Sequence, residues 1–96
     1  MRIGSLTCVY NQERFIGPAL EQLQPFVDYQ VVLLSPRPWY GQPDPPDRTR
    51  AMIEHYFPHV RLYIEDWPDE TCQRNQGLGR MRDCDYVWVC DTDEYY

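Results

Sequence analysis

Short apolar runs alternate along the chain with segments in which apolar residues recur at helical spacing. The apolar runs cover Ile3–Tyr10, Tyr29–Leu34, Val60–Ile64 and Tyr86–Cys90. Most are continuous and rich in β-branched residues, which is typical of strands covered on both faces. The third run alternates more and is expected near a sheet edge, whereas the fourth is the most convincing buried strand of all.

Between these runs lie three segments that predict helices. The apolar faces of the first two consist of Phe15, Ile16, Ala19, Leu20 and Leu23, and of Thr49, Met52, Ile53, Tyr56 and Phe57. Pro18 fits the first turn of the first helix, and Asp47 is expected to cap the second. The third helix, Thr71–Arg82, is weaker because Gly77 and Gly79 interrupt it.

The resulting order of elements is strand, helix, strand, helix, strand, helix, strand. Alternation of this kind predicts an α/β fold: a three-layer, Rossmann-like arrangement with a mainly parallel sheet of about four strands and helices on both faces. At this length we expect one domain, residues 1–96. Ligands of such sheets bind beyond the carboxyl ends of the strands, where the strand order reverses.

Charge and hydropathy exclude some function classes. The formal net charge is -6, with 15 acidic and 9 basic residues, so nucleic acid is not an expected partner. No apolar run has the length of about 18 residues that a membrane helix needs, and we expect no membrane segment in this chain. The spacing of the four cysteines matches no zinc motif, which favours reduced thiols and a cytoplasmic protein.

The densest group of polar residues follows the last strand. Asp91 and Asp93 stand two positions apart with Glu94 beside them, an arrangement that is costly unless a cation or strong hydrogen bonds compensate the charge. A hard divalent ion, Mn²⁺ or Mg²⁺, is the natural occupant. A solvated acidic turn is the alternative, since Asp-x-Asp also occurs by chance.

Other predicted strand ends carry groups suited to a nucleotide. Tyr10 and Asn11 follow the first strand, where a ring and an amide can stack on a base and hydrogen-bond to it. Arg74 and Asn75 lie upstream of the last strand, where a guanidinium suits a phosphate or a base carbonyl. The structural alternatives are a packing ring for Tyr10, an exposed helix position for Arg74 and a local cap for Asn75.

The order of these segments is more specific than any one of them. Cys8–Glu13, Asp47–Thr49, Arg74–Leu78 and Asp85–Glu94 together resemble glycosyltransferase family 2, of the GT-A fold. The resemblance spans nearly the whole chain, and its last two segments are its strongest part.

The resemblance implies the nucleotide-sugar-binding half of a metal-dependent glycosyltransferase. Its donor would be a nucleotide-diphospho-sugar, with a UDP-sugar favoured, and its acceptor hydroxyl is not identified. Asp91 and Asp93 would hold the metal, and Asp91 would also approach the ribose or sugar. The implied donor-binding residues are Tyr10, Asn11, Glu13, Ser35, Arg74, Asn75 and Asp91.

Two departures from the family pattern matter. Members often carry an aspartate at the end of the second strand, where this chain has Ser35, so the choice of nucleotide stays open. The family's catalytic base and acceptor elements follow the metal motif, and this chain ends three residues beyond Asp93. No catalytic residue is assigned, and His55 and His59 are expected at the surface. We expect part of a longer enzyme, whose sheet is completed by further chain segments or another chain.

Two other functions compete with this interpretation. A non-catalytic nucleotide- or partner-binding module would keep the half-sheet and dock on a larger assembly. A nucleotidyltransferase also binds its metal through aspartates and has a similar sheet. Such enzymes usually have a glycine-rich basic loop after the first strand, which Tyr10–Glu13 lacks.

Overall fold

The computed structural model describes residues 2–10, 14–35, 47–65, 67 and 70–90. The strands are β1 (Ile3–Val9), β2 (Tyr29–Leu34), β3 (Arg61–Ile64) and β4 (Tyr86–Val89). The helices are α1 (Ile16–Leu23), the 3₁₀ turn η1 (Gln24–Phe26), α2 (Thr49–Tyr56) and α3 (Glu70–Gly79). Each strand and helix expected from the sequence is present, with ends that shift by no more than three residues.

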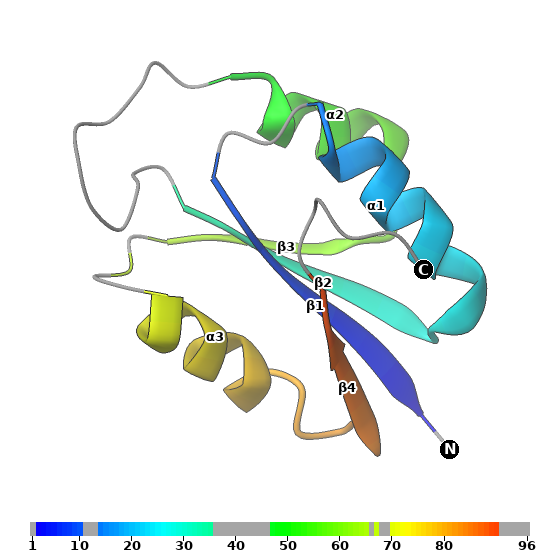
Figure 1. Ribbon diagram of the computed structural model, residues 1–96, viewed down its shortest axis with the longest axis vertical. Helices are drawn as coiled ribbons and strands as arrows, with labels where there is room; N and C mark the ends of the chain where they lie inside the picture. Colours follow the sequence, from blue (N-terminus) through cyan, green and yellow to red (C-terminus); the bar gives the residue numbers. More distant parts are fainter. Residues whose placement is uncertain (1, 11–13, 36–46, 66, 68–69, 91–96) are drawn as a thin grey trace.

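The strands form one parallel sheet in the order β3-β2-β1-β4 (Figure 1). Two successive connections step from β1 to β2 and from β2 to β3, and the third returns across the sheet to β4. Helices α1 and α2 cover one face and α3 covers the other, as expected when every crossover has the same hand (Figure 1). The predicted α/β, Rossmann-like fold is therefore confirmed, and the strand order reverses between β1 and β4.

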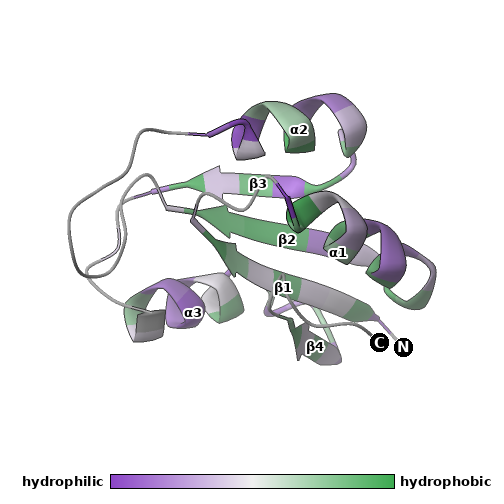
Figure 2. Cartoon of the chain, turned by 45° about the horizontal axis from the view of Figure 1, so that its top comes forward, coloured by the Kyte–Doolittle hydropathy of each residue, from purple (hydrophilic) through white to green (hydrophobic). Residues whose placement is uncertain are grey.

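The core has two sides, separated by the sheet. Alternate residues of β2 face opposite layers, with Val32 and Leu34 beneath α1 and α2 and with Val31 and Leu33 toward α3. This strand is buried along almost its whole length, and it is the most continuously hydrophobic strand (Figure 2). A strand covered on both faces needs no polar alternation, which explains the pattern of its sequence.

Helix α3 approaches the sheet closely at Gly77. A Cβ atom at this position would lie 2.6 Å from Leu6 Cδ1 and 2.8 Å from Leu33 Cδ1, and both leucines are fully buried. At Gly79, the last residue of α3, no atom lies within 4 Å of such a Cβ. Gly77 thus allows the weak helix to pack against β1 and β2, while Gly79 has no such role.

At the amino-terminal edge of the sheet, a cluster of hydrogen bonds and cation–π contacts is centred on Tyr29. The Tyr29 hydroxyl donates to Asp83 Oδ1 (2.8 Å) and contacts the Cys84 thiol, while the guanidinium groups of Arg2 and Arg61 lie 4.9 and 4.0 Å from the ring centroid. Burial and these hydrogen bonds raise the pKa of Tyr29, so the hydroxyl stays a donor. The cluster joins β1, β2 and β3 to the turn before β4.

Three expectations about burial are wrong. Strand β4 was expected to be deeply buried, yet in the described part of the chain it pairs with β1 alone, and Tyr86 is 63% exposed. Phe15 and Tyr56 were placed on the apolar faces of the first two helices but are 37% and 67% exposed. Phe15 is the N-cap of α1 and Tyr56 is the last residue of α2, so both lie at helix ends. Hydrophobic character indicates which residues can be buried, and the neighbouring elements decide which of them are.

Most other expectations hold. Strand β3 lies at a sheet edge, and no disulfide joins any of the four cysteines, all of which lie within the described residues. The cap expected at Asp47 is displaced: Asp47 Oδ1 accepts the backbone N–H of Thr49 (2.9 Å), but the N-cap residue of α2 is Arg48, which makes no side-chain cap hydrogen bond. Within the described ranges, no helix is both long and apolar enough to cross a membrane.

The close approach at Gly77 predicts opposite effects for two alanine substitutions. Gly77→Ala should lower the free energy of unfolding by about 1 kcal/mol, because overpacking costs more than the gain in helix propensity. Gly79→Ala, with open space around it, should leave stability unchanged or raise it by up to about 1 kcal/mol. Urea denaturation of both variants measures the difference, and an equal gain in both would show that α3 does not pack tightly at Gly77.

The Tyr29 cluster predicts an acid-sensitive contribution to stability. The hydrogen bond from Tyr29, assisted by the charge of Arg2, lowers the pKa of Asp83. A depressed carboxyl pKa stabilises the fold above the unfolded-state pKa, and this stability is lost as the pH falls through the folded-state value. In denaturation curves below about pH 4, Asp83→Asn and Tyr29→Phe should therefore show a shallower loss than the parent chain. Identical pH slopes would contradict this assignment.

Candidate functional site

The carboxyl edge of the sheet collects the residues that follow each strand. Tyr10 follows β1, Ser35 follows β2, Glu65 follows β3 and Cys90 follows β4. Helices α2 and α3 begin at this edge, because each runs back toward the start of the next parallel strand (Figure 1). The reversal of strand order between β1 and β4 marks the position where ligands of such sheets bind.

Tyr10 and Ser35 lie side by side at this edge. The Ser35 backbone N–H donates to the Val9 carbonyl (2.9 Å), which continues the β1–β2 pairing beyond the strand ends. Ser35 is buried and Tyr10 is partly buried. The structure therefore brings together two of the predicted donor-binding residues, and the pairing holds their backbone in place.

The first half of α3 is tied to the end of β2 through Gln73. This side chain is fully buried, and its Nε2 donates to the Leu33 carbonyl (2.8 Å). Arg74 is the next residue; it is partly buried and its Nε is shielded from solvent. The alternative of an ordinary exposed helix arginine does not describe it. Asn75 is exposed inside the helix, so it does not cap an end of α3.

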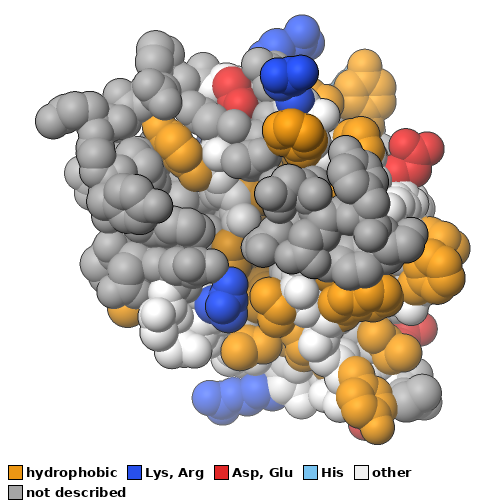
Figure 3. Space-filling model, in the orientation of Figure 1, with side chains coloured by type: hydrophobic (Ala, Val, Ile, Leu, Met, Phe, Trp, Pro, Cys, Tyr) orange, Lys and Arg blue, Asp and Glu red, His pale blue; other side chains and the backbone are white. Residues whose placement is uncertain are grey.

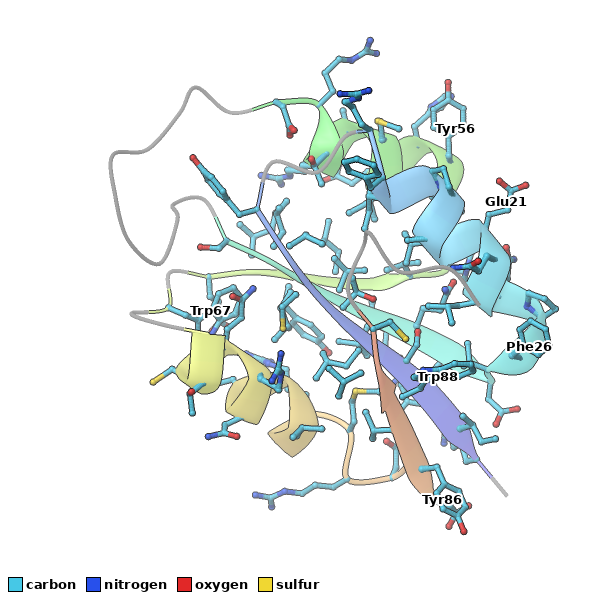
Figure 4. All side chains as sticks on the ribbon, viewed as in Figure 1. Glu21, Phe26, Tyr56, Trp67, Tyr86 and Trp88 are labelled. Carbon is cyan, nitrogen blue, oxygen red and sulfur yellow. The ribbon has the colours of Figure 1, made fainter. Side chains whose placement is uncertain are left out.

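A second set of contacts fixes the segment after β3. The Trp67 indole N–H donates to Gln76 Oε1 (2.7 Å), and Trp67 lies against α3 (Figure 4). Arg80 pairs with Glu65 and lies over the Tyr63 ring, 4.2 Å from its centroid. The first half of α3 is thus held to the end of β2, and Arg80, the residue after α3, is held to the end of β3.

The last strand reaches the same edge. The Cys90 backbone N–H donates to the Leu6 carbonyl (3.0 Å), and Cys90 is buried. Asn11, Glu13, Asp91 and Asp93 lie outside the described residues. In the part of the chain that the structure describes, no group of three or more His, Cys, Asp or Glu side chains is placed to hold a metal ion. The metal prediction therefore depends on Asp91 and Asp93.

Sequence reasoning missed the residues that position the site. Gln73, Trp67 and Gln76 are not strand ends and belong to no motif, and polar residues in a weak helix look like solvated ones. Only the small residue Gly77 hints in the sequence that this helix face is inward. His55 and His59 are exposed as expected, and His59 Nε2 lies 3.0 Å from Gln30 Oε1.

The chain matches no protein-family model and no curated protein. Function is therefore argued from the geometry of the carboxyl edge.

The bond from Gln73 predicts a measurable anchoring of α3. Gln73→Leu keeps the approximate volume but leaves the buried Leu33 carbonyl without its donor, so the free energy of unfolding should fall by about 1–3 kcal/mol. The matched variant Asn75→Leu, at an exposed position on the same helix, should change it by less than about 0.5 kcal/mol. Chemical denaturation compares the two, and equal losses would argue against the anchoring role.

Proposed function

We propose that this chain is the donor-binding part of a metal-dependent glycosyltransferase that uses a nucleotide-diphospho-sugar. One observation carries the proposal: the sheet reverses its order between β1 and β4, and the proposed nucleotide-binding and metal-binding residues follow these two strands. Such reversal points are where open parallel sheets bind nucleotides. The resemblance of the motif order to glycosyltransferase family 2 supports the same function.

The described residues fit the recognition of a nucleoside diphosphate. Tyr10 offers a ring on which a base stacks, and Ser35 beside it offers hydrogen-bonding groups at the end of β2. Arg74, on the helix tied to that strand, offers a guanidinium for the diphosphate or a base carbonyl. Asn11, Glu13 and Asn75 complete the proposed donor set.

Asp91 and Asp93 would hold the metal in this proposal, with Mn²⁺ or Mg²⁺ as the occupant. Carboxylates directly after a parallel strand match the oxygen ligands that these ions prefer. When bound, the ion supplies charge neutralisation for the departing diphosphate. The chain's own contribution is to bind the nucleotide and to hold the diphosphate at the edge between β1 and β4. The catalytic base and the acceptor are not assigned. The proposed compartment is a reducing one such as the cytoplasm, because no disulfide joins the four cysteines.

A second candidate function is a partner-binding module. The uncharged sequence of β4 favours it, because Tyr86 and Val89 are exposed on a strand that, within the described residues, pairs on one side only. Unpaired apolar strand edges are sites where another chain adds a strand. This function does not depend on Asp93.

Calorimetric titration of UDP, and then of GDP, into the chain with and without Mn²⁺ tests the donor function. Binding should require Mn²⁺, and Asp93→Asn should weaken it by about tenfold or more, because one carboxylate ligand is lost. Arg74→Gln should weaken binding with the metal present, since a charge-assisted hydrogen bond is removed.

Glu94→Gln serves as the matched control, because it removes a charge beside the motif without removing a proposed ligand. Loss of binding in Asp93→Asn but not in Glu94→Gln would support the metal role. If a folded sample binds neither nucleotide, the donor function is wrong and the partner-binding module is favoured.

A further inference from the structure

The outer surface between α1 and α2 contains two adjoining hollows. One has a volume of about 420 Å³ and is lined by Gly17, Pro18, Glu21, Gln24, Met52, Tyr56 and Phe57. The other has a volume of about 290 Å³ and is lined by Arg48, Ala51, Met52, His55 and Tyr56. Met52 and Tyr56 belong to both, so the two hollows meet at the Tyr56 side chain.

The Tyr56 ring is an exposed but supported platform. The side chain is 67% exposed, and the His55 ring meets it edge to face, with 4.5 Å between the centroids. In Figure 4, Tyr56 and Glu21 lie on the same side of the helical layer, far from Tyr86 at the other end of the molecule. An aromatic ring held in this way presents a flat apolar face at little entropic cost, since few rotamers are lost on binding.

Planar polar groups surround this ring. Glu21 and Gln24 line the larger hollow, and Arg48 and His55 line the smaller one. Among the residues that the structure describes, none of these four side chains has a hydrogen-bond or ion-pair partner. A carboxylate, an amide, a guanidinium and an imidazole are therefore open to a ligand that lies over Tyr56.

We propose that these hollows bind a neutral oligosaccharide whose chain crosses the Tyr56 ring. A sugar ring has an apolar C–H face that packs on an aromatic ring, and a rim of hydroxyls that donate to carboxylates and amides and accept from guanidinium and imidazole groups. Two hollows on either side of one ring suit neighbouring units of a chain. The site lies on the outside of the α1–α2 layer, and it does not rest on the proposed donor function.

Other occupants fit the surface less well. A helical peptide needs a continuous row of apolar anchors. Pro18, Met52 and Phe57 give the larger hollow an apolar floor, but Glu21 and Gln24 interrupt it, and Arg48 and His55 line the smaller hollow. Nucleic acid is disfavoured by the net charge of -6, and the Arg side chains on the face seen in Figure 3 form separate groups. A sugar chain needs no net charge on the protein and uses the polar groups that are present.

A larger side chain introduced at Gly17 can fill the larger hollow without disturbing the fold. A Cβ atom there would meet only Met52 Cε, at an ordinary contact distance of 3.8 Å. Gly17→Ala should therefore be tolerated and leave the hollow open, whereas Gly17→Phe should occupy it.

The test is an NMR titration of the ¹⁵N-labelled chain with maltohexaose, cellohexaose and N-acetylchitohexaose. At least one sugar should shift the amides around Glu21 and Tyr56, and Tyr56→Ala should weaken its binding by about tenfold. Gly17→Phe should also weaken binding, whereas Gly17→Ala should not. Tyr86→Ala, which removes a tyrosine of similar exposure on β4, should leave the affinity unchanged.

Three outcomes would overturn the proposal. The first is no shift with any of the three sugars, and the second is equal loss of binding in Tyr56→Ala and Tyr86→Ala. The third is binding of an apolar dye that is lost in Tyr56→Ala while no sugar binds, which would identify the surface as a protein- or lipid-docking site. Folding of each variant is checked from the dispersion of the same spectra.

Discussion

Strand β1 is hydrogen-bonded on both sides, to β2 and to β4, and this double pairing determines where the other elements lie. It places the reversal of strand order beside β1 and directs the ends of β1, β2 and β4 to one edge. Helix α3 reaches the sheet over β1 and β2 because Gly77 leaves room for Leu6 and Leu33. The carboxyl edge therefore depends on a strand that supplies few polar side chains to it.

The sequence predicted the fold well because its signals are local. Continuous apolar runs identified β1, β2 and β4, and the stronger alternation of β3 correctly indicated an edge strand. Burial was predicted less well, since the exposure of Tyr56 and Tyr86 depends on which other elements lie against the end of α2 and against β4. These are properties of tertiary arrangement, and no residue pattern within the segment contains them.

The site was predictable only in part, and the reason is chemical. Strand ends can be read from a sequence, so Tyr10 and Ser35 were found, and they are adjacent in the structure. The bonds that orient α3 come from Gln73, Trp67 and Gln76, whose amides and indole look unremarkable until their partners are known. Two kinds of residue thus make up this edge: those that could contact a ligand, and those whose hydrogen bonds fix the position of the ligand-binding residues. Sequence motifs identify mainly the residues that could contact a ligand.

The pairing of β1 with β4 has a consequence for the order in which the molecule assembles. Ile3 contacts Asp28 across 25 positions of sequence, whereas Arg2 contacts Asp85 across 83. Closing the longer loop costs more chain entropy, and distant pairings form slowly. The unit β1-α1-β2-α2-β3 can therefore gather before β4 arrives. The carboxyl edge formed by β1 and β4 would then be the last part of the molecule to form, and a ligand bound there would stabilise the final step of folding more than any earlier one.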